Sequence, residues 1–377
     1  MQRPDVVIVG GGIIGCAIAF FLAKSGVRPL VLERGQVGGE ASSGAAGMLT
    51  AQAHTDQPGP LFDLKLASRA LYEELAIELH DRTGLDIEYR KLGHVAPALT
   101  DEENEAVGRR VEWQRARGLP AVKLNRMEAR DLEPGLAPDV VGAGWFPEDH
   151  HVNNSAATQA LASAAMRLGG QIRTDCGVTD LVGEGQRVTG VRTKDERVST
   201  GTVILCAGAW MQEFEKAARI PIPIVPAKGQ IVVAKLEPPA LRHIVYGTAA
   251  YAVPRPSGEH IIGSTVEFVG FDKRVTVDGL TGILQGITRL VPDLHEGAMV
   301  ASWACLRPAA SDGLPILGRV PARPGLVIAT GHFRNGILLA PITGKLIAEL
   351  IADGKPSISL EPFCPDRPFP PGPPTDH

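Results

Sequence analysis

The chain has 377 residues, of which 44% are hydrophobic and 21% are charged, and its formal net charge is −4 at pH 7. This length suits two domains or one large domain with an insertion, and the composition is typical of a globular protein. Interspersed charges and an aromatic content of only 5% argue against a nucleic-acid partner, because neither a basic stripe nor a stacking surface is available.

The five cysteines are widely spaced, and no pair has the spacing of a zinc site or a redox motif. We therefore expect reduced thiols, no metal site and a cytoplasmic protein. The apolar start is interrupted at Gly10–Gly12, and no apolar run reaches 18 residues. The sequence thus predicts neither a signal peptide nor a membrane span.

The first predicted elements are a strand at Val6–Val9, a helix at Ile14–Lys24 and a second strand at Pro29–Leu32. Both strands are short apolar runs, which suits a parallel sheet that is buried on both faces. A strand, a helix and a strand in this order form the mononucleotide-binding βαβ unit of Rossmann-type domains.

Gly10, Gly12 and Gly15 connect the first strand to the helix with the G-x-G-x-x-G spacing. These glycines allow a tight turn, a close approach of the backbone to a pyrophosphate, and close packing of helix and strand. Glu33 ends the second strand, where a carboxylate accepts hydrogen bonds from both hydroxyls of an adenosine ribose. The unit predicts a dinucleotide site, but the motif itself does not choose between NAD and FAD.

The middle of the chain contains a small-residue loop at 38–49, suited to backbone contact with a cofactor, and then a mixture of helices and strands. Helices are predicted at 61–84, at 100–132 and, after a turn at 147–154, up to residue 169. Short strands are predicted at 171–175, 178–183, 187–192 and 198–206, and longer strands at 222–310 with one helix near 279–291. The segment after Leu360 is so rich in proline that we expect a flexible tail.

Two later segments favour FAD, because an FAD domain of this kind begins the chain and is completed by later segments. Thr202–Trp210 is a buried strand that leads into small residues, past which a cofactor can lie closely. Gly325–Gly344 is a strand, a glycine-containing loop and the start of a helix near Asn335–Gly336. The positive end of that helix can face the flavin pyrimidine, where reduction places negative charge.

We therefore predict an α/β protein with a Rossmann-type FAD-binding domain and a second, α+β domain built on a mostly antiparallel sheet. The expected FAD-binding domain is discontinuous and comprises residues 1–85, 145–218 and 312–360. The expected substrate-binding domain comprises residues 86–144 and 219–311, and residues 361–377 form the tail.

Seven segments spread along the chain are similar to a known family: VVIVGGGIIGCAIA, SSGAAGML, PAKGQ, YAVPR, IIGSTV, CLRPAASDGLPILG and GHFRNGILLAPITG. Together they resemble the glycine oxidase branch of the D-amino-acid oxidase family of FAD-dependent amine oxidases. The resemblance implies non-covalent FAD, a small amino-acid substrate, oxygen as electron acceptor and a homo-oligomer, either a dimer or a tetramer.

The implied reaction is the oxidation of glycine, sarcosine, D-alanine or D-proline by hydride transfer from Cα to flavin N5. The imine then hydrolyses to a 2-oxo acid and ammonia or an amine, and oxygen yields hydrogen peroxide. In bacteria, this family also implies a contribution to the thiazole half of thiamine. Two alternatives remain open: an FAD-dependent dehydrogenase with a quinone or carrier acceptor, and a flavin-binding redox sensor without an amine substrate.

Three residues are the candidates for the substrate site. Arg307 follows an apolar strand, where it can be a structural ion pair or a bidentate carboxylate clamp, and the resemblance favours the clamp. Tyr251 matches a family tyrosine whose hydroxyl reaches the same carboxylate. Arg334 matches an arginine near both substrate and flavin, or it pins its own loop.

The candidates for FAD binding come from the first βαβ unit, the small-residue loop, the central strands and the last helix start. They are Gly10, Gly12, Ile13, Ile14, Gly15, Glu33, Arg34, Ala41, Ser42, Ser43, Ala46, Gly47, Met48, Val178, Gly208, His332, Phe333, Arg334, Asn335, Gly336, Ile337 and Leu338.

Four further residues need separate interpretations. Val266 stands where this branch has a pocket-lining methionine, so the sequence predicts more room near the substrate Cα. Cys305 stands where monomeric sarcosine oxidases attach FAD covalently, but an inert buried thiol is favoured because a thiolate needs a tuned environment. His150 and His151 lie on a predicted turn, and we expect solvated loop histidines rather than catalytic ones.

Overall fold

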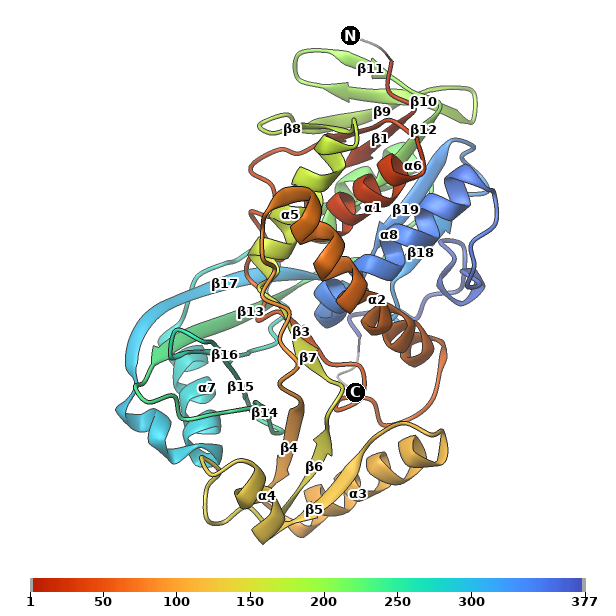
Figure 1. The fold of residues 1–377 in the computed structure, drawn as a ribbon. Coiled ribbons are helices and arrows are strands. Elements are labelled where there is room, and N and C mark those ends of the chain that lie inside the picture. The colour runs from red at the N-terminus through yellow and green to blue at the C-terminus, as the bar shows by residue number, and fades with distance from the viewer. Residues whose placement is uncertain (1–2, 375–377) are drawn as a thin grey trace.

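The computed structural model describes residues 3–374 and contains two large sheets and two small ones (Figure 1). The α-helices are α1 (Ile13–Lys24), α2 (Pro60–Thr83), α3 (Asp101–Ala116), α4 (Arg126–Leu132), α5 (Asn154–Arg167), α6 (Glu215–Ala218), α7 (Val277–Leu290) and α8 (Gly336–Ala352). Short 3₁₀ helices are η1 (Gly208–Phe214), η2 (Pro292–Glu296), η3 (Phe333–Asn335) and η4 (Glu361–Phe363).

The strands of the first half of the chain are β1 (Val6–Val9), β2 (Pro29–Leu32), β3 (Met48–Leu49), β4 (His94–Ala98), β5 (Val122–Asn125), β6 (Gly142–Phe146), β7 (His150–His151), β8 (Gln171–Arg173) and β9 (Val178–Glu184). Those of the second half are β10 (Arg187–Thr193), β11 (Arg197–Ser199), β12 (Thr202–Leu205), β13 (Ile224–Lys235), β14 (Ile244–Tyr246), β15 (Tyr251–Pro254), β16 (Glu259–Gly263), β17 (Ala298–Ala310), β18 (Ile316–Arg319) and β19 (Leu326–Thr330).

The first large sheet has the order β18-β19-β12-β1-β2-β8, and only β18 runs antiparallel to its neighbour. Alternate residues of β1 face opposite sides of it. Val6 and Ile8 pack with helices α1, α2, α5 and α8, whereas Val7 and Val9 pack against the three-stranded sheet β11-β10-β9. Because both faces of the sheet are covered, its strands read as continuous apolar runs.

The second large sheet has the order β17-β13-β16-β15-β14-β4-β6-β5 and is antiparallel except where β14 meets β4. This sheet contains strands from two segments that are distant in the sequence: β4 to β6 and β13 to β17. Helices α4 and α7 pack on one of its faces with Val232 and Ala252. Tyr251 and Val253, which alternate with Ala252, lie on the opposite face.

Figure 1 shows the six-stranded sheet with its helices in the upper half of the view and the eight-stranded sheet in the lower half. The long paired strands β13 and β17 curve between the two halves. This architecture confirms the predicted α/β fold with a second, mostly antiparallel sheet.

Several predicted elements are wrong in detail. The helix expected at 100–132 ends at Ala116, and the edge strand β5 separates it from α4, which begins with a capping box formed by Asn125 and Glu128. The strand expected at 198–206 is two strands that belong to different sheets, β11 and β12. Gly118 and Gly201 mark the two interruptions in the sequence, but the prediction from periodicity did not take these glycines into account.

The proline-rich segment after Leu360 is not a free tail over its described part. Phe363 is buried in the core that contains α1 and α8. Arg367 forms a part-buried ion pair with Asp312, with Nε 2.7 Å from Oδ2. Prolines fix the backbone of this segment but do not prevent an aromatic ring and an arginine from packing, so composition alone was misleading.

Helix α8 and the turn before it qualify, by length and composition, as a membrane span, which the sequence analysis did not expect. The stretch Phe333–Ala352 has a mean hydropathy of 1.4. In the structure, 67% of that window is buried inside the protein. Its apolar surface therefore packs against α1 and α2 in the core.

Candidate active site

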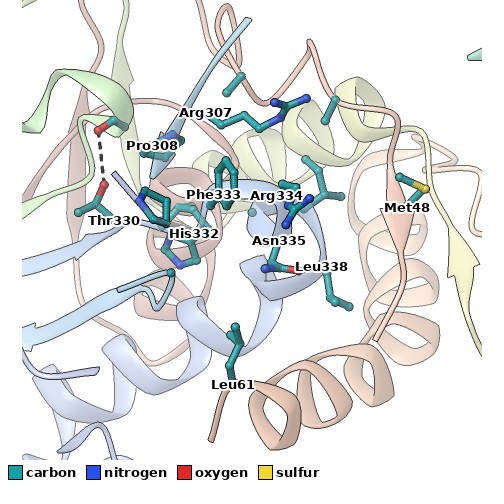
Figure 2. A pocket seen from close by; sticks show the side chains of 18 of the residues that line it. Met48, Leu61, Arg307, Pro308, Thr330, His332, Phe333, Arg334, Asn335 and Leu338 are labelled. Carbon is teal, nitrogen blue, oxygen red and sulfur yellow. Dashed lines mark hydrogen bonds between the residues drawn. The ribbon is translucent and has the colours of Figure 1, made fainter. Parts of the chain in front are cut away.

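A single large cavity of about 1130 Å³ collects most of the predicted site residues. It is lined by residues of both large sheets, for example Val9 and Leu32 of the first sheet and Ile231 and Leu306 of the second. Figure 2 shows part of its lining at close range. The cavity lies at the carboxyl ends of β1 and β2, where open α/β sheets bind ligands.

One end of the cavity is formed by the glycine loop and the start of α1. Gly10 has a φ of +108°, and a Cβ there would lie 2.5 Å from the carbonyl oxygen of Cys206. Gly12, the N-cap of α1, lines the cavity without a side chain. The first turn of α1 therefore presents backbone N–H groups and its positive dipole end to this space.

Glu33 closes β2 beside this loop. Its Oε2 accepts a hydrogen bond from the Gly11 amide at 2.6 Å, and its Oε1 accepts one from the Gly35 amide at 2.8 Å. Because each carboxylate oxygen has two lone pairs, both can still accept from a hydroxyl in the cavity. The neighbouring Arg34 guanidinium lies 3.7 Å from the centre of the Trp210 ring, which also lines the cavity.

The start of α8 forms another wall. The chain leaves β19, passes through η3 and enters α8 at Gly336, as the sequence predicted. His332, at the start of this turn, is buried, and its Nε2 lies 3.0 Å from the Thr343 hydroxyl. Burial lowers the pKa of His332 to about 3, so the ring is neutral. Thr330 donates to the Gly208 carbonyl at 3.5 Å, which joins this wall to η1 (Figure 2).

Arg307 reaches the cavity from β17. Its two terminal nitrogens donate to the Thr265 carbonyl at 3.1 Å and to the Ser264 hydroxyl at 2.7 Å. Gly229 lies on the same face of the neighbouring strand, and a Cβ there would overlap the Arg307 guanidinium. The glycine of the PAKGQ segment thus leaves the space in which the guanidinium lies.

Tyr251 lies on β15 and faces the same cavity. A Cβ on Gly263, its partner on β16, would lie 2.5 Å from the Tyr251 hydroxyl. Burial is the main cause that raises the pKa of Tyr251 to about 12, against the opposing effects of the Arg307 charge and a hydrogen bond with Ser264. The hydroxyl therefore keeps its proton and can donate a hydrogen bond.

Arg334 lies in η3 and approaches the cavity from the α8 side. Figure 2 shows the Arg307 and Arg334 side chains reaching toward the same open space, with Met48 and Leu61 at its margins. The Arg334 guanidinium also lies 5.0 Å from the centre of the Phe333 ring. Two arginines and a protonated tyrosine around one cavity make a strong site for a carboxylate.

The other predicted FAD-binding residues line the cavity, with two exceptions, Gly15 and Ser43. Gly15 instead permits close packing, because a Cβ there would overlap the Gly10 carbonyl oxygen. Val266 is not among the residues that line the cavity. The extra room near a substrate Cα therefore stays a prediction.

His150 and His151 are not solvated. They form β7, which pairs with β3, and they are 8% and 0% exposed. Burial lowers the pKa of His150 to about 4 and that of His151 to about 3. Neither lines the cavity, so both are structural.

Cys305 lines the cavity, and its Sγ lies 3.7 Å from the Gly44 carbonyl oxygen. Burial raises the pKa of this thiol. Because the thiolate is the reactive form, this surrounding favours an inert cysteine.

The sequence analysis missed a group of cavity residues from the loop after β3, helices α2 and α3, β14 and the segment after β16. They are Thr50, His54, Lys65, Arg110, Tyr246 and Ser264. Lys65 and Arg110 lie within helices whose charge pattern is typical of a solvent-exposed helix face. A motif search could have found only Ser264, which lies inside the quoted IIGSTV segment.

Comparisons with known proteins agree with this geometry. Residues 5–350 match the family described as FAD dependent oxidoreductase (DAO). The chain is 38% identical to the glycine oxidase of Geobacillus kaustophilus over 364 residues, 96% of each chain. The crystal structure of that protein matches with a TM-score of 0.95, covering 98% of this chain and 100% of the other.

Two other relatives have different names. The chain is 38% identical over 363 residues to the bifunctional protein ThiO/ThiG of Nostoc sp., covering 95% of this chain and 54% of that protein. The crystal structure of L-proline dehydrogenase from P. horikoshii matches with a TM-score of 0.89 at 26% identity, covering 97% of each chain.

Proposed function

Because this chain belongs to the family of FAD-dependent oxidoreductases, we propose that it oxidises glycine and other small amino acids, with oxygen as electron acceptor. The proposed products are the imine or its 2-oxo acid, ammonia or an amine, and hydrogen peroxide. The substrates that we propose are glycine, sarcosine, D-alanine and D-proline.

The residues around the cavity fit FAD. The open N-terminus of α1 and the side-chain-free Gly12 suit a pyrophosphate, and the Glu33 carboxylate suits an adenosine ribose. The start of α8 offers a second positive helix end for the flavin ring. When bound, FAD supplies the redox chemistry by accepting two electrons from the substrate and passing them to oxygen.

The protein binds and orients the amino acid. Arg307 and Tyr251 would hold the carboxylate through the fork of the guanidinium and the phenolic hydroxyl. The two histidines that line the cavity, His54 and His332, have pKa values that burial lowers, so neither adds a positive charge beside the substrate amine. The cations that line the cavity, among them Arg307 and Arg334, disfavour a protonated amine. They therefore favour the uncharged amine, which is the form whose Cα hydrogen can leave as hydride.

The single observation that carries the proposal is that Arg307, Tyr251 and the FAD-binding loop share one cavity. The test is a substrate panel of glycine, sarcosine, D-alanine and D-proline, scored by anaerobic bleaching of the flavin and by peroxide release with oxygen alone. Bleaching by none of these amines would overturn the proposal and would favour the flavin-binding sensor.

A dehydrogenase is the second candidate, because the L-proline dehydrogenase of P. horikoshii shares the fold at a TM-score of 0.89. The same panel separates the two. A dehydrogenase would show bleaching by an amine without stoichiometric peroxide, and turnover would require an added quinone or other acceptor.

Four further features belong to the proposal. Exposed apolar side chains at Phe268, Phe271, Met299 and Val300 support a homo-oligomer, which light scattering would measure. The similarity to the Nostoc ThiO/ThiG protein supports a role in thiamine thiazole synthesis. We also propose a cytoplasmic location and the domain limits given above, which the division of the chain between the two large sheets supports.

A further inference from the structure

The Arg307 guanidinium is held by a short segment that follows β16. The Thr265 carbonyl accepts a hydrogen bond from it at 3.1 Å, and the Ser264 hydroxyl accepts another at 2.7 Å. Both partners are neutral, and within residues 3–374 no carboxylate forms an ion pair with Arg307. The charge of Arg307 is therefore available to a substrate carboxylate, and the direction of its remaining N–H groups depends on where this segment lies.

This segment forms a β-bulge against β13, which lies between β16 and β17 in the sheet (Figure 1). Ile231 of β13 pairs with Gly263, and beyond the end of β16 Lys228 pairs with Glu267. Three residue steps separate the paired residues on β13, but four separate them on the other strand, which thus has one extra residue. A bulge bends its strand and re-aims the groups within it. Both residues that accept from Arg307 lie in this bulge.

The Glu267 side chain fixes the bulge to β13. Its Oε1 accepts from the Thr265 hydroxyl at 2.5 Å and from the Gln230 side-chain amide at 2.7 Å, and its Oε2 lies 2.7 Å from the Lys228 ammonium. The Thr265 hydroxyl in turn accepts from the Gln230 backbone amide at 3.1 Å. Because this hydroxyl both donates and accepts, Thr265 is held from two sides, and its carbonyl has a defined position relative to β13.

Charge and burial make this support strong. Lys228 is only 2% exposed, and its backbone and that of Glu267 exchange two hydrogen bonds, at 2.8 and 3.0 Å. Burial acts to raise the pKa of Glu267, but the hydrogen bonds from Lys228, Thr265 and Gln230 together lower it. The carboxylate is therefore ionised at neutral pH, and its hydrogen bonds are charge-assisted. Gln230 also accepts from the Thr276 amide at 2.8 Å, which ties the same unit to the start of α7.

We propose that Thr265 and Glu267 are positioning residues of the carboxylate clamp: Glu267 fixes Thr265, and the Thr265 carbonyl directs the fork of Arg307 into the cavity. Neither residue lines the cavity, so each acts on a bound carboxylate only through Arg307. This inference rests on the proposed function, in which Arg307 holds the substrate carboxylate. A guanidinium without this support rotates about its side-chain bonds, and a ligand must then remove that freedom in order to bind.

The first test measures acetate binding to the FAD-loaded protein by isothermal titration calorimetry. Thr265→Val keeps the shape and the carbonyl of the residue but removes its hydroxyl, so we expect the dissociation constant of acetate to rise about tenfold. Glu267→Gln, which removes the charge that holds Thr265, should weaken binding by about the same factor. Thr265→Ser keeps the hydroxyl and should stay within about threefold of the wild type.

Glu133→Gln is the matched control for a loss of stability. Glu133 is a buried carboxylate at the end of α4 that accepts from the backbone amides of Arg242 and His243, each at 2.9 Å, and it does not line the cavity. This variant should lower the melting temperature and leave the affinity for acetate unchanged. If Glu133→Gln and Thr265→Val weaken acetate binding equally, the effect is general destabilisation and the positioning role is refuted.

The second test is a double-mutant cycle with the most active amine of the substrate panel. Thr265→Val should raise KM and lower kcat together, as expected for Arg307→Ala but to a smaller extent. In the Arg307→Ala background, Thr265→Val should change kcat/KM by less than about twofold, because no clamp remains to be positioned. Effects of the two substitutions that simply multiply would show that Thr265 acts independently of Arg307, which refutes the proposal.

The outcomes separate this inference from the proposed function. If amines are oxidised and acetate binds, but Thr265→Val equals the wild type, the positioning role is refuted and the proposed function stands. If no amine is oxidised, but acetate binding depends on both Arg307 and Thr265, the proposed function fails and the positioning role stands. If the wild type does not bind acetate, the clamp and its positioning are refuted together.

Discussion

Replacing Arg307 by alanine tests the assignment on which the proposed reaction depends most. A guanidinium has five N–H donors. Arg307 uses two of them on Thr265 and Ser264, which leaves three for a substrate carboxylate. Losing one bidentate, charge-assisted contact costs about 2–5 kcal/mol, or roughly 30-fold to several-thousand-fold in kcat/KM.

The effect should divide between binding and turnover. The clamp holds the substrate in the ground state and in the transition state, and it also sets the position of Cα. We therefore expect KM to rise and kcat to fall together in steady-state peroxide assays. Arg307→Lys should recover little of the activity, because a lysine presents a point charge without the planar fork.

Stability and FAD content serve as the controls. The variant loses two internal hydrogen bonds that face the cavity, so the free energy of unfolding should fall by at most about 2 kcal/mol. Acetate, which lacks an amine, should bind to the wild type and fail to bind to Arg307→Ala. Arg109→Ala, which removes an exposed arginine on α3, should leave kinetics unchanged. Normal kinetics in Arg307→Ala, or loss of FAD with unfolding, would show that Arg307 is structural.

Glu33→Ala should weaken FAD retention, measured as flavin release on gel filtration, far more than it lowers turnover of the FAD-saturated enzyme, because the carboxylate borders the βαβ loop. Unchanged FAD affinity would contradict the dinucleotide site. FAD should leave the protein on acid precipitation, because burial raises the pKa of the Cys305 thiol. Yellow colour that stays with the precipitate and disappears in Cys305→Ala would instead show a covalent bond. Gly229→Ala should lower kcat/KM about tenfold or more with little loss of FAD, because the Cβ of the new alanine would overlap the Arg307 guanidinium. Steady-state kinetics equal to those of the wild type would refute the role of Gly229 in positioning Arg307. Lys65→Met should raise the free energy of unfolding at pH 7 by up to about 3 kcal/mol, since burial lowers the lysine pKa from 10.5 to about 8. Between pH 8 and pH 10.5 the unfolded wild type binds more protons than the folded one, so the stability of the wild type rises with pH. The stability advantage of the variant should therefore shrink in melting curves recorded from pH 7 to 10. An advantage that stays constant would contradict the lowered pKa.

Local patterns predicted the elements that surround the FAD-binding loop. The apolar runs at β1 and β2, the three glycines and the helix between them appear where the sequence placed them, because each depends on neighbouring residues alone. The helix start at Gly336 was predicted for the same reason. The prediction failed at 100–132, where one charged helix was expected and the structure has the edge strand β5 between two helices. An exposed strand such as β5 lacks the alternating apolar pattern that would reveal it.

Site residues that lie in recognisable motifs were predicted, whereas site residues that reach the cavity only through tertiary packing were missed. Arg307 and Tyr251 lie in segments that resemble a family, so their shared cavity was expected. Lys65 lies in the long helix α2 with no motif around it, and it lines the cavity only because α2 packs on α8, to whose backbone Ser68 is hydrogen-bonded. Val266 lies beside a motif but is not among the residues that line the cavity.

The sequence by itself determined the fold class and the dinucleotide-binding unit, because short-range spacing encodes turns, buried strands and helix starts. The nature of the reaction came from the resemblance of its motifs to a family and not from spacing. Only the tertiary structure decided that β4 to β6 complete the sheet of β13 to β17, that His150 and His151 are buried, and that Phe363 and Arg367 hold the proline-rich segment in place. These features depend on contacts between residues far apart in the chain. The free energy of such contacts comes from surfaces that meet only when the two sheets and their helices have packed, and no local pattern records which surfaces those are.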